Sequence, residues 1–198
     1  MNFLAHIFLS GDNHDLILGN LIADAVKGNQ DGQFRKDILR GIQLHRAIDS
    51  FTDQHPCVIQ SKLRLREEFH KYAGVIADML YDHFLAKHWN DYSKVSLPVS
   101  AAQTYMILTN NYNILPDRTK IIMPYMINNN WLVSYAVLDN MQRHFEGMAR
   151  RTTSRSSFDS GMERAVEMIR PDYKLFEKEF REFFPDVMEF SNNFIKNQ

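Results

Sequence analysis

The stretch FRKDILRGIQLHRAIDSF, residues 34–51, decides the fold of this chain. Its apolar residues Phe34, Ile38, Ile42 and Ile48 recur at the spacing of an α-helix, which places them on one side. Clean apolar–polar alternation, the mark of a half-buried strand, is rare along the whole chain. The stretch therefore predicts an amphipathic helix whose apolar side packs into a core.

The same spacing continues on both sides of this helix. Upstream, residues 16–27 predict a helix that Gly28 can end; downstream, Pro56 predicts the start of another, and Gly74 interrupts the pattern before the next. Val58, Leu63 and Phe69 are the expected core contacts of the helix after Pro56. Further helices are expected over 99–112, 118–127, 132–151, 157–169 and 172–183, the last ending near Pro185. The prediction is an all-α fold, one compact multi-helix domain spanning 1–198.

Length and charge limit the function classes. The chain has 198 residues, 44% of them hydrophobic and 24% charged, which is typical of one soluble globular domain. A net charge of −1 disfavours nucleic acid as a partner. No apolar run is long enough for a membrane span, and the opening MNFLAHIFLSG lacks the basic start of a signal peptide. We expect a cytoplasmic protein, with no membrane partner.

The residue types available for chemistry are few. Cys57 is the only cysteine, which excludes disulfides and a thiolate zinc module, whereas there are eight histidines. Any metal site must therefore use imidazole and carboxylate ligands. This ligand set suits manganese, iron, zinc or cobalt, because magnesium prefers oxygen ligands.

Ionisable residues occupy positions where amphipathic helices place core residues. His45 shares the face of Ile38 and Ile48, and Asp49 follows it by four residues, so the two side chains are neighbours. In the helix after Gly74, His83 lies on the apolar face. Because a bundle core can gather such groups from facing helices, one bound cation would stabilise them together.

Other acidic groups extend this pattern. Asp78 and Asp82 are four residues apart beside the face of His83, and Asp24 lies at the edge of the helix over 16–27. The plain alternatives remain open: a helix hydrogen bond for His45–Asp49, a half-exposed pair for Asp82–His83, and an ion pair with Lys27 for Asp24. His6 is equally compatible with a satisfied core histidine.

A basic stretch lies near residue 150. Arg143, Arg150, Arg151 and Arg155 share it with one acid, Glu146. One interpretation is a solvated helix end, where cations meet the helix dipole favourably. The other is a surface that binds an acidic partner.

Four segments resemble the acyl carrier protein phosphodiesterase family. They are MNFLAH at the start, GNLIADAVKG at 19–28, GIQLHRAIDSFTDQHP at 41–56 and YDHFLAKHW at 81–89. Weaker similarities continue through LPDR at 115–118, TSRSS at 153–157 and FFPDVM at 183–188. The resemblance implies an all-α fold similar to a divergent branch of the HD-type metal phosphohydrolases.

The resemblance also implies an activity in lipid metabolism. It is hydrolysis of the phosphodiester that joins 4′-phosphopantetheine to a serine of holo acyl carrier protein, an acidic protein partner. The implied cofactor is a divalent metal, expected to be Mn²⁺, with Mg²⁺, Fe²⁺ or Co²⁺ as alternatives. The basic stretch is then the expected docking surface for the carrier.

The resemblance selects positions that helical spacing had already singled out. The implied metal ligands are Asp24, His45, Asp82 and His83, with His6 and Asp78 supporting them. Asp24, His45 and Asp49 are the implied catalytic residues. Because Arg46 follows His45 directly, we add it as a catalytic candidate that donates to a phosphate oxygen, with an ordinary surface arginine as the alternative. The chain departs from the usual pattern, because its adjacent pair reads Asp82–His83 rather than His–Asp.

Two other functions fit the same residues. An HD-like phosphohydrolase of a nucleotide or another small phosphoester would use the same metal ligands without docking a carrier protein. A helical binding module would use the His and Asp residues only as structural pairs and would bind no metal. The sequence leaves the oligomeric state open.

Overall fold

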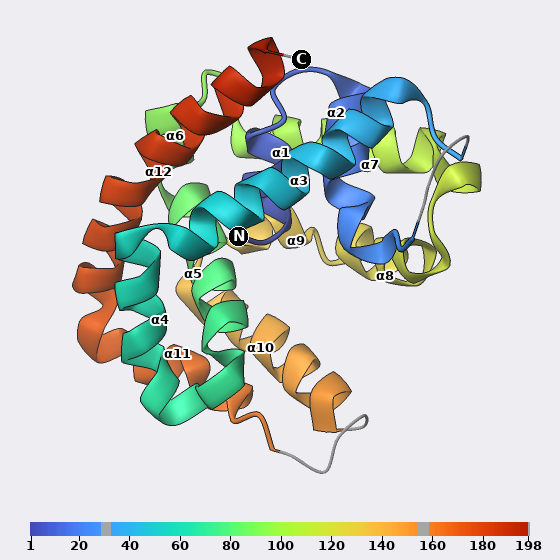
Figure 1. The fold of residues 1–198 in the computed structure, drawn as a ribbon. Coiled ribbons are helices and arrows are strands. Elements are labelled where there is room, and N and C mark those ends of the chain that lie inside the picture. Colours follow the sequence, from blue (N-terminus) through green and yellow to red (C-terminus); the bar gives the residue numbers. More distant parts are fainter. Residues whose placement is uncertain (29–32, 154–158, 198) are drawn as a thin grey trace.

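Helices build all the regular structure in the described part of this chain (Figure 1). The structure is a computed structural model that describes residues 1–28, 33–153 and 159–197. It is 83% helical, and those ranges contain no strand, which confirms the predicted all-α fold. No helix within them has the length and apolar character needed to cross a membrane.

Twelve α-helices follow one another in the described ranges, joined by short 3-10 turns. The first six are α1 Phe3–Phe8, α2 His14–Ile22, α3 Lys36–Gln54, α4 Pro56–Phe69, α5 Ala73–Lys87 and α6 Trp89–Tyr92. The others are α7 Leu97–Asn110, α8 Asp117–Asn128, α9 Trp131–Ser134, α10 Leu138–Thr153, α11 Ala165–Ile169 and α12 Tyr173–Lys196. The 3-10 turns are η1 Ala23–Ala25, η2 His70–Tyr72, η3 Tyr112–Ile114, η4 Met162–Arg164 and η5 Arg170–Asp172.

Several predicted helix ends differ from the observed ones. Gly74 does not interrupt the pattern: the break comes at His70, which adopts φ 47°, and Gly74 lies in the first turn of α5. Pro185 does not end the last helix, because buried residues on both sides of it, Phe183 and Phe184 before and Val187 after, hold α12 against the core. Leu63 is exposed rather than buried. The helix predicted over 132–151 is two helices, α9 and α10.

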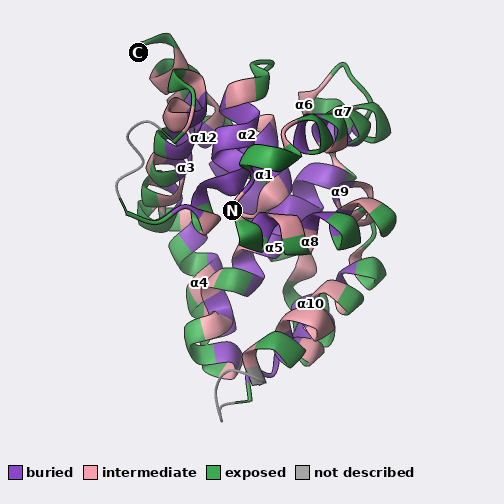
Figure 2. Cartoon of the chain, turned by 90° about the vertical axis from the view of Figure 1, so that its right-hand side faces the viewer, coloured by how far each residue is buried: buried purple, intermediate pink, exposed green. Residues whose placement is uncertain are grey.

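The core forms one continuous cluster of buried apolar side chains. Figure 2 shows the buried segments gathered around α1, α2 and α5, with exposed residues on the outer sides of the surrounding helices. The long helix α12 runs along one side of the molecule, against α3 and α4 (Figure 1). Helix α3 packs most extensively against α2 and also contacts α4 and α12, whereas α1 packs against α2 and α5.

Two glycines allow α2 and α3 to cross at very short range. A Cβ atom on Gly19 would lie 2.0 Å from the carbonyl oxygen of Ile38, and one on Gly41 would lie 2.4 Å from the carbonyl oxygen of Leu16. Any side chain at either position would therefore push the helices apart. The close crossing brings polar residues of α2 within hydrogen-bond distance of α3.

The short helix α1 is held by a carboxylate from α5. Asp82 is completely buried and accepts hydrogen bonds from the backbone amides of Leu4, Ala5 and Asn2, at 2.7, 3.1 and 3.3 Å. The first amides of a helix have no partner within the helix, so this side chain satisfies groups that burial would otherwise leave unpaired. Asp82 thereby fixes the position of α1 against α5.

Candidate metal centre

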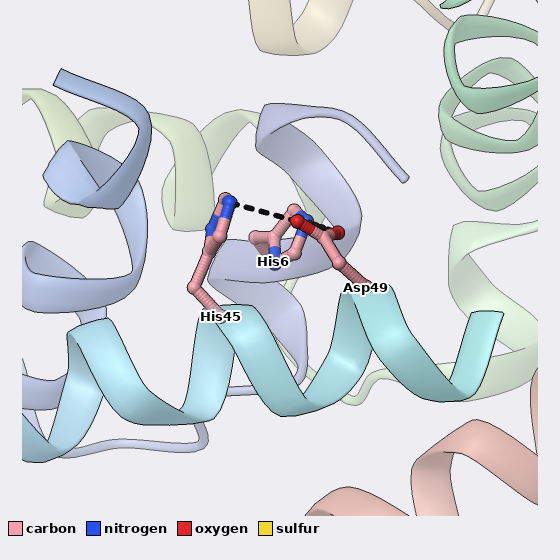
Figure 3. Close-up of side chains that lie close together, drawn as sticks. All are labelled: His6, His45 and Asp49. Atoms are coloured by element: carbon pink, nitrogen blue, oxygen red, sulfur yellow. Dashed lines mark ion pairs between the residues drawn. The ribbon is translucent and has the colours of Figure 1, made fainter. Parts of the chain in front are cut away.

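Two histidines and an aspartate from α1 and α3 meet in the interior. His45 and Asp49 project from the same face of α3 toward His6 of α1 (Figure 3). Asp49 contacts both rings: one oxygen lies 3.2 Å from His6 Nε2 and the other 3.1 Å from His45 Nε2. The two imidazole rings stack, with centroids 4.0 Å apart and an interplanar angle of 18°.

Asp24 approaches this cluster from η1. Its Oδ1 lies 3.3 Å from His45 Nε2, while its side chain remains 75% exposed. The observed η1 turn at the end of α2 carries it there, where the sequence predicted a continuous helix. Asp24 is thus the member of the group that faces both the buried rings and solvent.

Asn20 of α2 orients the ring of His45. Its Nδ2 donates to the carbonyl oxygen of His6 and to Ser10 Oγ, at 3.0 and 2.9 Å, so its Oδ1 is the atom that faces His45. His45 Nδ1 lies 3.0 Å from that oxygen and must carry the proton of the hydrogen bond. In the neutral ring, Nε2 then presents its lone pair to Asp24 and Asp49, as a metal ligand requires.

The ring nitrogens at the cluster lack directed hydrogen bonds. Both nitrogens of His6, and Nε2 of His45, are buried without a hydrogen-bond partner. The carboxylate oxygens are near enough, but they do not lie along the N–H directions closely enough to satisfy them. Unpaired buried polar atoms are costly, so this arrangement is typical of a site that receives another group.

The electrostatics of the cluster favour a positive charge. Burial by itself lowers the pKa of His45, but the carboxylates of Asp24 and Asp49 raise it to about 9. Burial lowers the pKa of His6 to about 4, against the smaller effect of Asp49, so that ring is neutral. The pKa of Asp49 is lowered, since contacts with the two rings outweigh its burial. When no metal ion is bound, the two carboxylates therefore keep His45 protonated at neutral pH.

The donor set fits a divalent metal. His6, His45 and Asp49 each offer a ligand atom, and these atoms lie within 4.8 Å of one another. Ligands about 2.0–2.2 Å from a shared ion are about 3–4 Å apart, which matches the observed contacts of 3.1–3.2 Å. Two imidazoles with carboxylate oxygens suit a transition ion better than magnesium.

The structure does not bring Asp82 and His83 into this group. Asp82 caps α1, and burial raises its pKa to about 7 although the amide donors favour the carboxylate. His83 Nδ1 lies 2.7 Å from the carbonyl oxygen of Tyr135, and its Nε2 lies 2.7 Å from the hydroxyl oxygen of Tyr173. The polar atoms of both potential ligands are thus already within hydrogen-bond distance of other groups of the protein.

The remaining predicted site residues lie around the cluster or away from it. Asp78 lies 3.1 Å from the amino group of Met1, which is also 4.0 Å from Asp49. Arg46 is exposed on α3 beside His45. Arg143, Arg150 and Arg151 are exposed on α10, whereas Arg155 lies outside the described residues.

Sequence reasoning missed Asn20 and gave His6 only a supporting role. Asn20 stands in an apolar stretch of α2 and is completely buried, so a polar residue among buried apolar ones was the available signal. Nothing local in the sequence indicates that α1 brings His6 to α3, because the contact depends on the docking of α1.

Comparison with known proteins gives a consistent family. The family profile described as acyl carrier protein phosphodiesterase matches residues 1–187. The acyl carrier protein phosphodiesterase of Photorhabdus laumondii is 32% identical over 194 residues, 98% of this chain and 96% of the relative. Those of Serratia proteamaculans and an Escherichia coli strain are 32% and 34% identical, each over 96% of both chains. No solved structure matches this chain.

Proposed function

Because this chain belongs to the acyl carrier protein phosphodiesterase family, we propose that the cluster of His6, His45 and Asp49 is the centre at which it hydrolyses the phosphodiester of holo acyl carrier protein. The products are the apo carrier protein and 4′-phosphopantetheine. One observation carries the assignment: two buried imidazoles with unpaired nitrogens face a single ionised carboxylate.

The chain's own residues would divide the work as follows. His6, His45 and Asp49 bind a divalent ion, for which we propose Mn²⁺, while Asn20 orients the ring of His45. Such an ion supplies Lewis acidity to a phosphate oxygen and makes a water molecule more acidic. The His45 contact lowers the pKa of Asp24, so this carboxylate is ionised and supplies a negative charge and hydrogen-bond acceptors at the solvent side.

Arg46 and the α10 arginines would bind the substrate. Arg46 is exposed one residue from His45 and has a planar group suited to phosphate oxygens. Arg143 and Arg150 have no acidic partner among the described residues, and with Arg151 they form a basic surface for an acidic carrier. Asp82 and His83 would not belong to the centre, because Asp82 accepts hydrogen bonds from the backbone of α1 and His83 contacts the carbonyl oxygen of Tyr135.

The decisive experiment uses metal-depleted protein, holo acyl carrier protein and added Mn²⁺, with the mass of the carrier as the readout. We expect loss of the phosphopantetheine mass, and we expect EDTA to prevent it. His45→Ala and Asp49→Asn should lower kcat/KM by more than about 100-fold, since loss of even an outer partner of a ligand costs 10–100-fold.

Asp53→Asn is the matched control. Asp53 lies on α3 one turn beyond Asp49, but it is exposed and pairs with Lys62, so its loss should leave turnover unchanged. A carrier whose mass never changes while Mn²⁺ is bound contradicts the activity. A fully active Asp49→Asn protein contradicts the centre alone.

The docking surface has its own test. Arg143→Glu combined with Arg150→Glu should raise KM for the carrier and reduce the dependence of KM on salt, because fewer charges attract the acidic partner. Arg66→Glu on α4, another exposed arginine, is the control. An equal effect of both changes contradicts a specific role for α10.

A further inference from the structure

A cleft lies on the solvent side of the candidate centre and shares Asp24 with it. Its lining is mostly apolar and includes Phe3, Leu21, Leu108 and, from α8, Ile122, Met123 and Met126. The cavity volume is about 40 Å³ and the cleft opens to solvent, so it is a narrow apolar groove in which only part of a chain-like ligand would be covered. Figure 1 shows α8 beside the segment that follows α2, where Asp24 is located.

The cleft contains one acidic and one basic side chain, Asp24 and Arg118. Asp24 reaches His45 at 3.3 Å, so the end of the cleft that it forms adjoins the centre. Arg118 of α8 also lines the cleft, is exposed, and has no ion-pair partner in the described part of the chain. An unpaired guanidinium beside an otherwise apolar cleft is suited to a ligand that has a phosphate and a largely uncharged chain.

We propose that this cleft receives the 4′-phosphopantetheine arm of the carrier, with Arg118 as a donor to its phosphate and Ile122 against the pantetheine chain. The proposal rests on the proposed function, because it takes the substrate from there. Arg118 differs from Arg46 in that it lines the cleft itself. The carrier protein would remain outside while only its prosthetic arm enters.

Two neighbouring isoleucines provide a matched pair of variants. Ile122 lines the cleft, whereas Ile121 is 67% exposed and does not. Ile122→Trp should fill the space, and Ile121→Trp should add the same bulk to the outer surface of the same helix. Circular dichroism and the melting temperature then confirm that both variants are folded.

The test measures binding of two small probes, pantetheine and 4′-phosphopantetheine, by calorimetry to the metal-depleted full chain. Both should bind the parent protein and Ile121→Trp, and Ile122→Trp should weaken both by at least about tenfold. Arg118→Ala should weaken 4′-phosphopantetheine by about tenfold or more and leave pantetheine unchanged, because only the former offers a charged acceptor. Arg118 is exposed, so this variant is informative even if Ile122→Trp fails to fold.

The outcomes separate this inference from the activity. Absence of pantetheine binding, or equal weakening by Ile121→Trp and Ile122→Trp, overturns the cleft assignment whether or not the carrier is hydrolysed. Binding with the expected pattern supports the cleft. If that pattern occurs while holo carrier protein keeps its mass in the presence of Mn²⁺, the cleft assignment stands and the proposed activity fails.

Discussion

At the scale of single residues, Asn20 determines which nitrogen of His45 faces the centre. Its amide group has two donors and one oxygen, and the donors are used by His6 and Ser10. The oxygen is therefore left for His45 Nδ1, which fixes the tautomer with Nε2 toward the carboxylates. In the proposed centre, Asn20 would therefore act on the metal through His45, without binding it.

Replacing Asn20 tests this positioning role. Asn20→Leu keeps the approximate size but removes the acceptor, so Mn²⁺ affinity should fall about 10–100-fold. Titration calorimetry measures the affinity, and circular dichroism shows whether the helices persist. An unchanged affinity in a folded variant would mean that the ring of His45 is held by its carboxylate neighbours alone.

A second prediction for a single residue concerns His144, which lies outside the centre and makes the stability of the fold depend on pH. Burial, with a smaller contribution from Arg151, lowers the pKa of His144 to about 4 from 6.5. Between these values the unfolded chain binds a proton that the folded chain does not. Stability from this residue is therefore complete above about pH 6.5 and is lost as the pH falls toward 4.

The comparison with His144→Gln isolates that effect. Relative to the variant, the parent should lose at most about 1.4 kcal/mol of unfolding free energy per pH unit below 6.5. Urea unfolding at pH 7.5, 6.0 and 5.0 measures the difference, in which the titration of all other groups cancels. A difference that stays constant over this range contradicts a half-buried neutral ring beside Ser134.

At the scale of elements, the crossing of α2 and α3 connects packing to chemistry. Gly19 and Gly41 lie where the helices touch; Gly19 directly precedes Asn20, and Gly41 lies about one turn before His45. The distance at which α2 packs therefore sets the distance at which Asn20 meets His45. A change in packing should appear in metal binding as well as in stability.

Adding one methyl group tests this coupling. Gly19→Ala should destabilise the protein by about 1–3 kcal/mol and weaken Mn²⁺ binding, because its Cβ would collide with the backbone of α3. Gly147→Ala is the control: nothing lies within 4 Å of its Cβ, so it should stabilise α10 by about 0.5–1 kcal/mol. Urea unfolding measures the stability of each variant, and titration calorimetry measures its Mn²⁺ affinity. Equal, small effects would show that the crossing can relax.

At the scale of the whole molecule, the centre joins segments that are far apart in the sequence. Helical spacing was sufficient to predict that His45 and Asp49 are neighbours, because both lie on one helix face. It was insufficient for His6, whose position depends on how α1 docks. It also treated Asp82 and His83 as available ligands, although α1, Tyr135 and Tyr173 occupy them. Local periodicity determines helices, whereas long-range packing determines which polar groups remain unpaired.

Metal binding should stabilise the entire fold. An ion that binds only the folded chain adds about 2.7 kcal/mol at 100 times its Kd, which corresponds to about 5–10 °C in Tm for a protein of this size. Differential scanning calorimetry with Mn²⁺ measures the shift, and EDTA should reverse it. Asp49→Asn should remove it. A shift of the same size in that variant would place the ion elsewhere.

Because Asp82 of α5 caps α1, the first helix to be synthesised cannot be the first to dock in the fold. The capped amides precede this carboxylate by 77 to 80 residues. A nascent chain therefore makes His6 long before it makes the group that fixes the position of His6. Since α1 has only six residues and short helices are marginal on their own, it gains a stable place only after α5 has emerged. The centre is consequently a late product of folding, and a translating ribosome should carry an α1 that has not yet docked.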